Sequence, residues 1–340
     1  MSLIGGTRGA VGVVAAGRYG ITLAEQAARN GHDVVLLTTS ARRAATLKRH
    51  RRLPSVVPEL DRLHERVVVT SDARDIAARC TLVLVTASEE DFGQLIGVLG
   101  DALDGSHIVV HAIHRLFGPR LSRVTEEIRS RTAVKQVGVM AGPMHVSEVL
   151  GGKPNAAVVG SSFPAAIEAV RDAISAEHIR VEGSDDNRGV ELAAALGQVV
   201  ALAVGIADGL QLGAATHATL ITRGLAEMTE VGVRLGALPG TFYGLAGVGR
   251  LVDALRRGEP NYQAGLDIGS APDLQVALAN LPTDALAFAV LKPLSDYADY
   301  FRVSLPISLT VKRILEGGCA PDEAIREALR QDLVSSVRGE

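Results

Sequence analysis

The sequence predicts two domains of different classes: an α/β domain built on a parallel sheet, and an all-helical C-terminal domain. Over residues 8–185, short continuous Val and Leu runs alternate with helical stretches, which is typical of parallel strands buried on both faces. Over residues 186–335 the strand-like runs stop, and long apolar helical stretches replace them. At 340 residues the chain is long enough for two such domains, and we place their junction near residues 183–188.

The α/β domain begins with a strand–turn–helix–strand segment. Val11–Ala15 is a short apolar run that ends in a glycine-containing turn over residues 16–20. Helical periodicity begins at Ile21, and the dipeptide Asn30-Gly31 predicts the end of that helix. The next strand is expected at Asp33–Leu37, and the segment as a whole predicts the start of a right-handed parallel sheet.

Further apolar runs predict the remaining strands and helices. The expected strands are residues 67–69, 82–85, 108–111, 137–140, 156–159 and 179–181. Helical stretches separate most of them, for example residues 92–99 and 121–128. In the second domain, long helices are expected at residues 190–210 and 215–235.

The overall composition argues against several classes of binding partner: nucleic acid, metal ions and the membrane interior. The net charge is −3, which gives no basic field for nucleic acid. Cys80 and Cys319 lie far apart and in no ligand spacing, so we expect no metal site, and a reducing, cytoplasmic compartment fits. The N-terminus shows no charged-then-apolar signal pattern. Residues 192–207 are apolar except for Gln198, but they fall short of the roughly 20 residues that a spanning helix needs, so we expect a buried core helix and no membrane insertion.

The first turn carries a degenerate dinucleotide fingerprint. Its three glycine positions serve a tight turn, close approach of a pyrophosphate, and helix–strand packing, and here they read Ala15, Gly17 and Gly20. The strand and helix around them are those of a Rossmann-type parallel-sheet domain, which predicts NAD or NADP as cofactor. The alternative is a sheet that keeps these glycines for packing only. The predicted cofactor-binding residues are Gly17, Arg18, Tyr19, Gly20 and Val146.

The choice between NAD and NADP stays open. An acid at the end of the second strand favours NAD and an arginine favours NADP, but Thr38-Thr39-Ser40 provide neither. Arg42 and Arg43 are close enough in sequence to reach a 2′-phosphate, although surface solvation explains them equally well.

Several long motifs occur in the order of one known family. They are Gly189–Leu192 continuing to Gly205–Leu210, Leu220–Met228, Gly244–Gly249, Gly142-Pro143 with Glu148-Val149, Asp185-Asp186 and Leu305–Ile307. Together they strongly resemble the bacterial-type NAD(P)-dependent glycerol-3-phosphate dehydrogenases, over nearly the whole chain. The resemblance implies a phosphorylated small-molecule substrate, dihydroxyacetone phosphate or glycerol 3-phosphate, and a homodimer.

The resemblance also identifies active-site residues of the family that this sequence replaces. The family passes hydride from the nicotinamide while a lysine supplies a proton to the forming alkoxide, which requires a cation beside the carbonyl oxygen. That lysine follows a Glu-Leu-Gly-Gly-Ala-Leu pattern, and the matching position here is Gly197. The family's second active-site lysine falls on Ala112. This sequence departs from the family at other positions too. It has Met144-His145 where the family has Ser-Phe, and Arg250 where the family has an acid. It has Pro260 in place of the arginine of an Arg-Asn pair, and Thr39 in place of another arginine.

Other residues are candidates for the lost roles. His145 could act as a general acid near neutral pH, and Gly142, Asn261 and Arg223 are the predicted substrate-binding residues. Arg250, with Arg223, could hold a phosphate. The alternative for His111, His114 and His145 is that they are solvated or satisfied in the core. A metal cluster of these histidines lacks supporting spacing.

Two functions fit the sequence. One is an oxidoreductase of this family whose standard activity is impaired or altered. The other is a catalytically degenerate paralogue that senses a nucleotide or phosphometabolite, or binds a partner. A binding protein needs Gly17 and Gly20 but no proton donor, which matches what the sequence retains.

Overall fold

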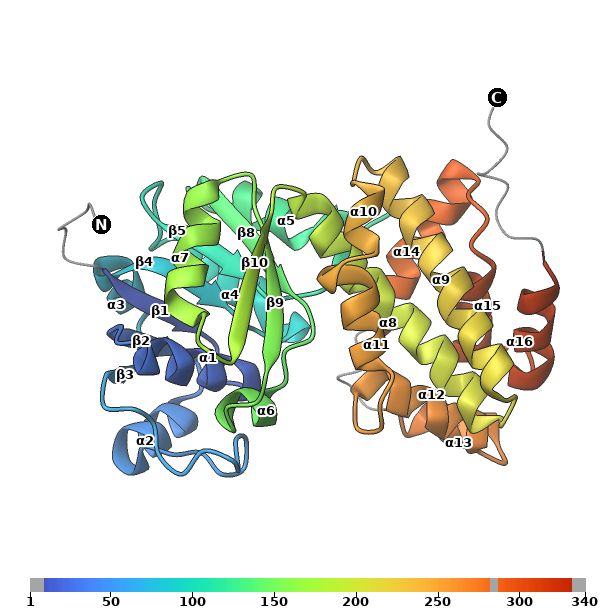
Figure 1. Ribbon diagram of the computed structural model, residues 1–340, viewed down its shortest axis with the longest axis horizontal. Coiled ribbons are helices and arrows are strands. Elements are labelled where there is room, and N and C mark those ends of the chain that lie inside the picture. The colour runs from blue at the N-terminus through green and yellow to red at the C-terminus, as the bar shows by residue number, and fades with distance from the viewer. Residues whose placement is uncertain (1–8, 282–286, 332–340) are drawn as a thin grey trace. The chain divides into compact units, whose positions relative to one another are not determined.

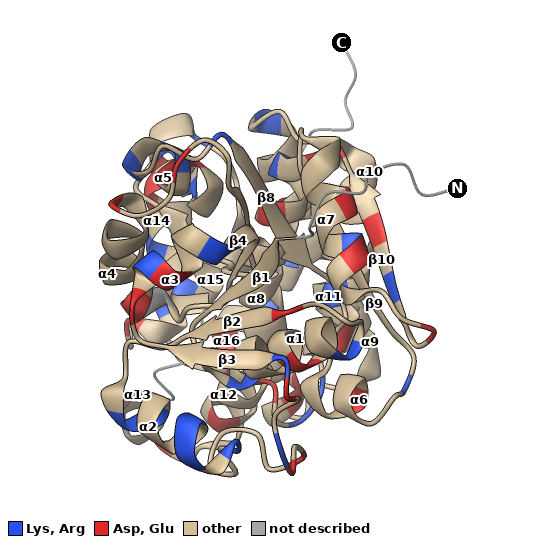
Figure 2. Cartoon of the chain, turned by 90° about the vertical axis from the view of Figure 1, so that its left-hand side faces the viewer, with Lys and Arg blue, Asp and Glu red and all other residues tan. Residues whose placement is uncertain are grey.

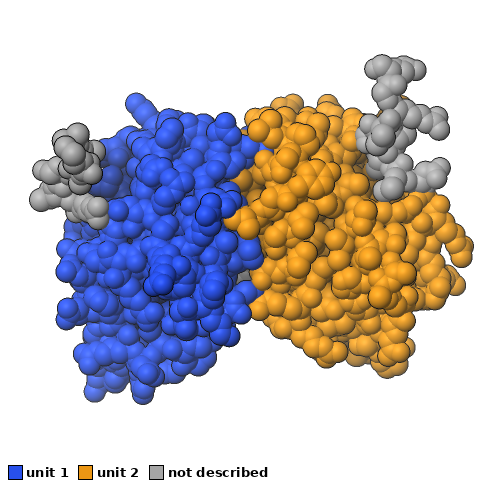
Figure 3. Space-filling model, in the orientation of Figure 1, with its two compact units in different colours: residues 1–113, 125–187 blue, residues 114–124, 188–340 orange. Residues whose placement is uncertain are grey.

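The computed structural model describes residues 9–281 and 287–331, and these fold into two compact units. Of the described residues, the sheet unit contains 9–113 and 125–187, and the helical unit contains 114–124, 188–281 and 287–331 (Figure 3). The Rossmann-type sheet domain and the helical C-terminal domain that the sequence predicts are both present (Figure 1).

The sheet unit is built on eight strands in the order β10-β9-β8-β5-β4-β1-β2-β3. Each expected strand is present, and the bounds are β1 (Ala10–Val14), β2 (Val34–Leu37), β3 (Val67–Thr70), β4 (Cys80–Val85), β5 (Ile108–His111), β8 (Gln136–Ala141), β9 (Asn155–Gly160) and β10 (Ile179–Ser184). Its helices are α1 (Arg18–Arg29), α2 (Ala41–His50), α3 (Ala73–Arg79), α4 (Glu89–Gly100), α5 (Val124–Arg131), α6 (Val146–Leu150) and α7 (Pro164–Ile174).

Helices cover both faces of this sheet. Val11 and Val13 of β1 join a buried cluster with residues of α1 and α7, which pack against each other. Gly12, whose neighbours in β1 face that cluster, lies against Ile76 of α3 on the opposite face. The first helix ends as predicted, because the N–H groups of Asn30 and Gly31 bond back to α1 and Gly31 has a φ of +88°.

One strand pair departs from the expected parallel sheet. β9 runs antiparallel to β8, whereas the other neighbours are parallel. The link between β8 and β9 contains only the five-residue helix α6, so the chain returns along the sheet instead of crossing over it.

A helix expected at residues 121–128 begins later, at Val124. Gly118 and Leu121 have φ values of +60° and +52°, which a helix does not allow, and they turn the chain into an antiparallel pair of β6 (Leu116–Phe117) and β7 (Ser122–Arg123). Arg123 lies 3.6 Å from Glu191, and β6 contacts α14, so this pair belongs to the helical unit. The helical unit is therefore not wholly helical, and the segment 114–124 lies outside the sheet domain expected at 8–185.

The helical unit packs around α8, whose apolar window is completely buried, as expected for a core helix. Its elements are α8 (Asn187–Gly209), α9 (Ala214–Arg234), α10 (Pro239–Phe242), η1 (Leu245–Gly249), α11 (Arg250–Ala254), α12 (Pro260–Ser270), α13 (Leu274–Ala279), α14 (Ala287–Phe301), α15 (Pro306–Leu315) and α16 (Pro321–Arg330). α8 and α12 touch backbone to backbone: a Cβ on Gly205 would lie 2.3 Å from the Tyr262 carbonyl oxygen, and one on Gly265 would lie 2.4 Å from that of Leu202. The motif around Gly205 is thus explained by close helix packing.

Candidate functional site

The sheet unit has a point where strand order reverses, between β1 and β4. From β1 the chain passes to β2 and β3 on one side, while β4, β5 and β8 lie on the other. In open parallel sheets, ligands bind outside the carboxyl ends of the strands at this point. Thr86, directly after β4, joins the two strand ends, because its Oγ1 donates to the carbonyl oxygens of Val14 at 3.0 Å and Ala15 at 3.2 Å. Thr86 was not identified from the sequence, although it directly follows the strand expected at residues 82–85.

Different physical constraints act on the residues at the three fingerprint positions after β1. Ala15 has a φ of +81°, where an L-residue is strained, so this position favours the glycine of the full fingerprint. A Cβ on Gly20 would lie 2.0 Å from the Ala15 oxygen and 2.5 Å from Thr86 Oγ1, so packing alone requires this glycine. Within the described part of the chain, a Cβ on Gly17 would meet nothing within 4 Å. Packing therefore explains Gly20 but not Gly17.

The N-terminus of α1 directly follows Gly17. Gly17 is its N-cap, no side chain caps it through a hydrogen bond, and its first turn contains no acid. Such an N-terminus attracts an anion through its backbone N–H groups and the helix dipole. The open space at Gly17 and the uncapped helix are the features that a pyrophosphate requires.

Arg18, Tyr19 and Val146 have distinct surroundings. The Arg18 guanidinium contacts Glu59 and donates to the Val56 carbonyl oxygen at 3.4 Å. Tyr19 and Val146 are partly buried and pack against the same core cluster of the sheet unit. The structure therefore places Gly17, Arg18 and Tyr19 at one turn, whereas Val146 lies on the short helix α6.

The end of β2 presents hydroxyl groups and leads into a basic helix. Thr38 Oγ1 accepts from the Ser40 N–H at 3.3 Å, and Ser40 Oγ caps α2 by accepting from the Arg43 N–H at 3.3 Å. Arg42 and Arg43 are exposed, and Figure 2 shows how basic residues colour α2. The end of β2 thus offers hydroxyl groups, and the helix that follows it offers two exposed arginines.

The end of β5 provides no cation. His111 is completely buried; its Nδ1 accepts from the Ile113 N–H at 3.3 Å, so the ring proton is on Nε2, 3.1 Å from Thr125 Oγ1. This is a histidine satisfied within the sheet unit. Ala112, the position of the family's second lysine, donates its N–H to the Val85 oxygen and packs its methyl group against the core.

Gly142 and His145 follow β8. Gly142 has a φ of +116°, and a Cβ there would lie 3.2 Å from the Ala157 Cα, so the turn itself requires glycine. His145 is partly exposed at the start of α6, and its backbone N–H donates to Asn155 Oδ1 at 2.8 Å. Substrate contact at Gly142 and acid catalysis at His145 stay predictions.

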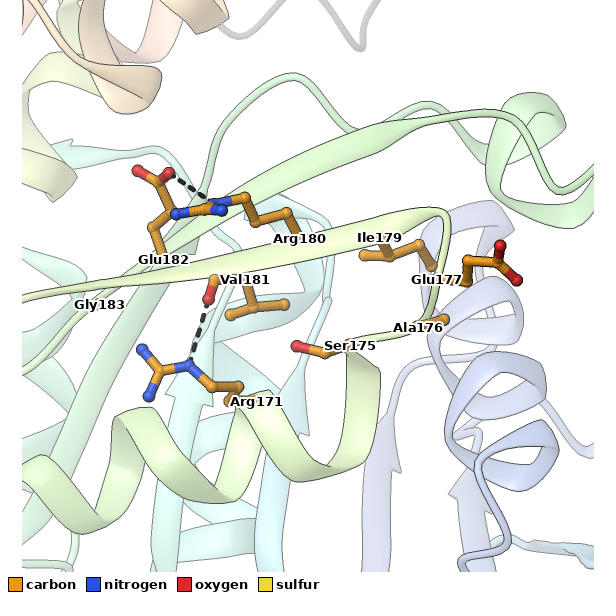
Figure 4. A pocket seen from close by; sticks show the side chains of 9 residues that line it. All are labelled: Arg171, Ser175, Ala176, Glu177, Ile179, Arg180, Val181, Glu182 and Gly183. Atoms are coloured by element: carbon orange, nitrogen blue, oxygen red, sulfur yellow. Dashed lines mark hydrogen bonds and ion pairs between the residues drawn. The ribbon is translucent and has the colours of Figure 1, made fainter.

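A pocket of about 870 Å³ lies elsewhere in the sheet unit, beside the edge strand β10 (Figure 4). Its polar groups bond to one another: Arg171 Nε donates to the Val181 oxygen at 3.3 Å, and Arg180 lies 2.9 Å from Glu182. The predicted site residues do not line it, and its charges cover a sheet edge.

In the helical unit, Gly197 lies in the buried middle of α8. Among the described residues outside its own helix turn, a Cβ there would meet only Met228 Cε, at 3.6 Å, so the position has room for a side chain that the sequence does not supply. The neighbouring Gln198 accepts from Asn261 Nδ2 at 2.6 Å, and Asn261 Oδ1 accepts from the Ala287 N–H at 2.9 Å. Asn261 is only 4% exposed, and its amide joins α8, α12 and α14.

Arg250, at the family's acidic position, belongs to a compensated charge network. It lies 3.3 Å from Asp253 and 3.6 Å from Glu259, and Arg256 approaches the same two acids at 3.8 Å and 3.2 Å. Two cations and two anions thus neutralise one another. His114 is nearby; burial and, to a lesser extent, Arg250 lower its pKa to about 3, so its ring is neutral at physiological pH.

Arg223 and Glu227 stabilise other helices. Arg223 donates to the Ala328 carbonyl oxygen of α16 at 2.9 Å. The buried Glu227 carboxylate caps α15 by accepting from the N–H groups of Ile307 at 2.6 Å and Ser308 at 3.1 Å, and from Ser308 Oγ at 2.9 Å. Burial raises the pKa of Glu227 to about 7, although these hydrogen bonds and Arg223 act in the opposite direction. The sequence does not reveal this cap, because its partners lie about 80 residues apart.

Lysines are few and lie at the surface. The chain has lysines only at positions 48, 135, 153, 292 and 312; the first four are exposed and the last is partly so. Lys292 and Lys312 lie 3.3 Å from Asp296 and Glu316 on their own helices. The lysines are absent from α8 and from the residues that directly follow the strands, so none replaces the two missing ones locally.

Comparison with known proteins gives one consistent result. Residues 10–166 match the model of the NAD-dependent glycerol-3-phosphate dehydrogenase N-terminus, and residues 186–326 match that of its C-terminus. A glycerol-3-phosphate dehydrogenase (NAD(P)+) of Citrifermentans bemidjiense is 31% identical over 331 residues, covering 95% of this chain and 97% of the relative. One from Trichlorobacter lovleyi is 33% identical over 337 residues, covering 95% and 98%. The crystal structure of glycerol-3-phosphate dehydrogenase from Coxiella burnetii superimposes with a TM-score of 0.87, at 25% identity, over 95% of this chain and 99% of that one.

Proposed function

We propose a function for this chain from one premise: it belongs to the NAD-dependent glycerol-3-phosphate dehydrogenase family. The cofactor of this family is NAD or NADP, and its substrate is a phosphorylated small molecule. We propose that this chain binds the dinucleotide at the turn between β1 and α1. We further propose that its interconversion of glycerol 3-phosphate and dihydroxyacetone phosphate is strongly impaired.

The observation that carries the second proposal is Gly197. Hydride transfer to a ketone creates an alkoxide, which needs a proton donor or a cation within hydrogen-bond reach. The family resemblance puts a lysine at Gly197 and another at Ala112, and neither residue can supply a charge. Loss of a single oxyanion-stabilising group costs roughly 10²–10³ in rate, and residues that act as a unit are not additive.

The residues present fit the dinucleotide better than they fit the substrate. The Gly17 turn leaves space in front of an uncapped helix N-terminus, where the dinucleotide would place its pyrophosphate. Bound there, the cofactor would supply the hydride. Asn261, Arg223 and Arg250 have their polar groups engaged in helix packing or in ion pairs. A substrate phosphate would have to compete with those contacts, which supports weak substrate binding.

A second candidate is a binding protein that senses a nicotinamide dinucleotide or a phosphometabolite. The retained Gly17 turn together with the replaced lysines favours it, because sensing needs affinity without proton transfer. The two candidates predict the same binding but differ in residual turnover.

The test measures binding and turnover on one preparation. We expect NADH or NADPH to raise the melting temperature, since a ligand at about 100 times its Kd stabilises by roughly 2.7 kcal/mol. We expect turnover at least about a thousandfold below that of the Citrifermentans bemidjiense relative, with both cofactors and in both directions. Robust turnover would contradict impairment and direct attention to His145, whose replacement by Gln would then abolish it.

The family resemblance also leads us to propose a cytoplasmic homodimer. In the helical unit, Tyr243, Tyr300 and Phe301 are 64%, 73% and 48% exposed, which favours a partner surface there. The free thiols of Cys80 and Cys319 suit a reducing compartment. Light scattering on the eluting protein tests the dimer, and a mass of one chain at all concentrations would exclude it.

A further inference from the structure

Arg18 is the first residue of α1 and directly follows Gly17. Helical side chains point toward the N-terminus of their helix, so Arg18 carries its charge to the end where the dinucleotide fingerprint lies. Its guanidinium forms an ion pair with Glu59, and it donates to the Val56 oxygen at 3.4 Å. The two charged side chains are 45% and 30% exposed, so a ligand from solvent can reach both.

The segment that carries Glu59, residues 51–66, is anchored without this ion pair. The buried Glu25 of α1 accepts from the His64 N–H at 2.8 Å. Arg51 donates to the Val67 oxygen at 3.0 Å, and the Leu63 N–H donates to the Arg51 oxygen at 2.6 Å. Val57, Leu60 and Leu63 are buried in the core of the sheet unit. Glu59 is thus held beside α1 by contacts that do not depend on Arg18.

Glu59 keeps its charge in this position. Burial alone would raise its pKa, but a hydrogen bond from its own backbone and the contacts with Arg18 outweigh burial and lower the pKa of this carboxyl. The first turn of α1 contains no acid of its own. Glu59 therefore supplies a carboxylate to the one arginine at this N-terminus, and a pyrophosphate at Gly17 would need the same cation.

We propose that Arg18 binds the pyrophosphate of the dinucleotide and that Glu59 competes with the nucleotide for it. The inference rests on the proposed dinucleotide binding and assigns it a specific cation and a built-in competitor. On binding, the Arg18 guanidinium exchanges the carboxylate for phosphate oxygens, and Glu59 sets the affinity below what the turn would otherwise reach.

The test is a double-mutant cycle on the full chain, with the Kd of NADH measured by calorimetry. The variants are Glu59→Gln, Arg18→Gln and the double variant, with Asp61→Asn as matched control, because Asp61 is an exposed acid in the same segment. Exposed ion pairs are worth up to about 1 kcal/mol, so Glu59→Gln should tighten binding roughly threefold to fivefold. Arg18→Gln should weaken binding, and in its background Glu59→Gln should have no effect. Asp61→Asn should leave the Kd within about twofold of wild type.

Each possible result of this cycle supports or refutes the competition between Glu59 and the dinucleotide for Arg18. If Glu59→Gln tightens binding equally with and without Arg18, simple repulsion operates and the competition is refuted. If wild type binds NADH and the variants bind equally well, the inference fails while the proposed dinucleotide binding stands. If neither wild type nor Glu59→Gln binds NADH or NADPH, the proposed binding fails and the inference with it. Binding by Glu59→Gln alone supports the competition.

Discussion

The β1–α1 turn and the surroundings of α8 differ in how far contacts within the protein explain their family motifs. At the turn, Gly17 precedes an uncapped helix, and a Cβ added to it would lie more than 4 Å from every other described residue that could pack against it. Around α8, the polar residues that resemblance associates with substrate hold helices together, as Asn261 does. The difference teaches that packing accounts for a family motif in one unit but leaves Gly17 unexplained in the other.

The comparison is tested most strongly by one substitution made in each unit. Gly265→Ala places a Cβ about 2.4 Å from the Leu202 oxygen, so we expect it to destabilise the helical unit by about 3 kcal/mol. Gly17→Ala adds the same methyl group to open space and should cost less than about 1 kcal/mol, as N-cap changes from Gly do. Urea unfolding of both variants measures this, and equal losses would show that the two glycines do not differ.

The next largest effect concerns Asn261. Its replacement by Ala leaves the Ala287 N–H and the Gln198 oxygen without their buried partner, which should cost about 2–3 kcal/mol. The Kd of NADH should not change, because the Gly17 turn lies in the other unit. A variant of wild-type stability would instead favour the predicted role of Asn261 in substrate binding.

Glu227 should make the stability of the helical unit depend on pH. Its pKa is raised from 4.5 to about 7, so the folded state holds this proton more tightly than the unfolded state. The stabilisation is therefore fully present below pH 4.5 and is lost as the pH rises toward 7. Melting temperatures of wild type and Glu227→Gln across this range should differ in slope, with the variant flatter; parallel curves would show that Glu227 does not titrate there.

The smallest expected effect is at Ala15. Its φ of +81° costs an L-residue about 1 kcal/mol, which Ala15→Gly should recover. The gain should appear in the sheet unit as a higher urea midpoint with an unchanged m-value. A loss of stability would mean that the added freedom of the unfolded chain outweighs the relieved strain.

Much of the sheet unit could be predicted, because buried parallel strands and glycine turns are local signals. The continuous runs from Val11 to Val181 gave strands near their true positions. The hairpin around Gly118 could not be found this way, since its place depends on Arg123 reaching Glu191, 68 positions farther along the chain.

The candidate site was only partly predictable for a related reason. The sequence identified Gly17 and Gly20 together, but only the contacts around their missing Cβ atoms separate open space from packing. Arg223 and Asn261 looked available because their partners, Ala328 and Ala287, are distant in sequence. The position of Glu59 could not be predicted, because no pattern in the segment 51–66 indicates that this residue lies beside α1.

We propose that this chain retains dinucleotide binding and has lost the family's catalysis. The most direct measurement titrates wild type and Gly17→Val with NADH, and then adds dihydroxyacetone phosphate to the saturated wild type while the nicotinamide absorbance is followed. We expect wild type to bind, a folded Gly17→Val to bind no NADH, and the absorbance of the wild-type complex to stay constant at the sensitivity of a thousandfold rate loss. Rapid, stoichiometric loss of the absorbance, or unchanged binding by Gly17→Val, would contradict this account.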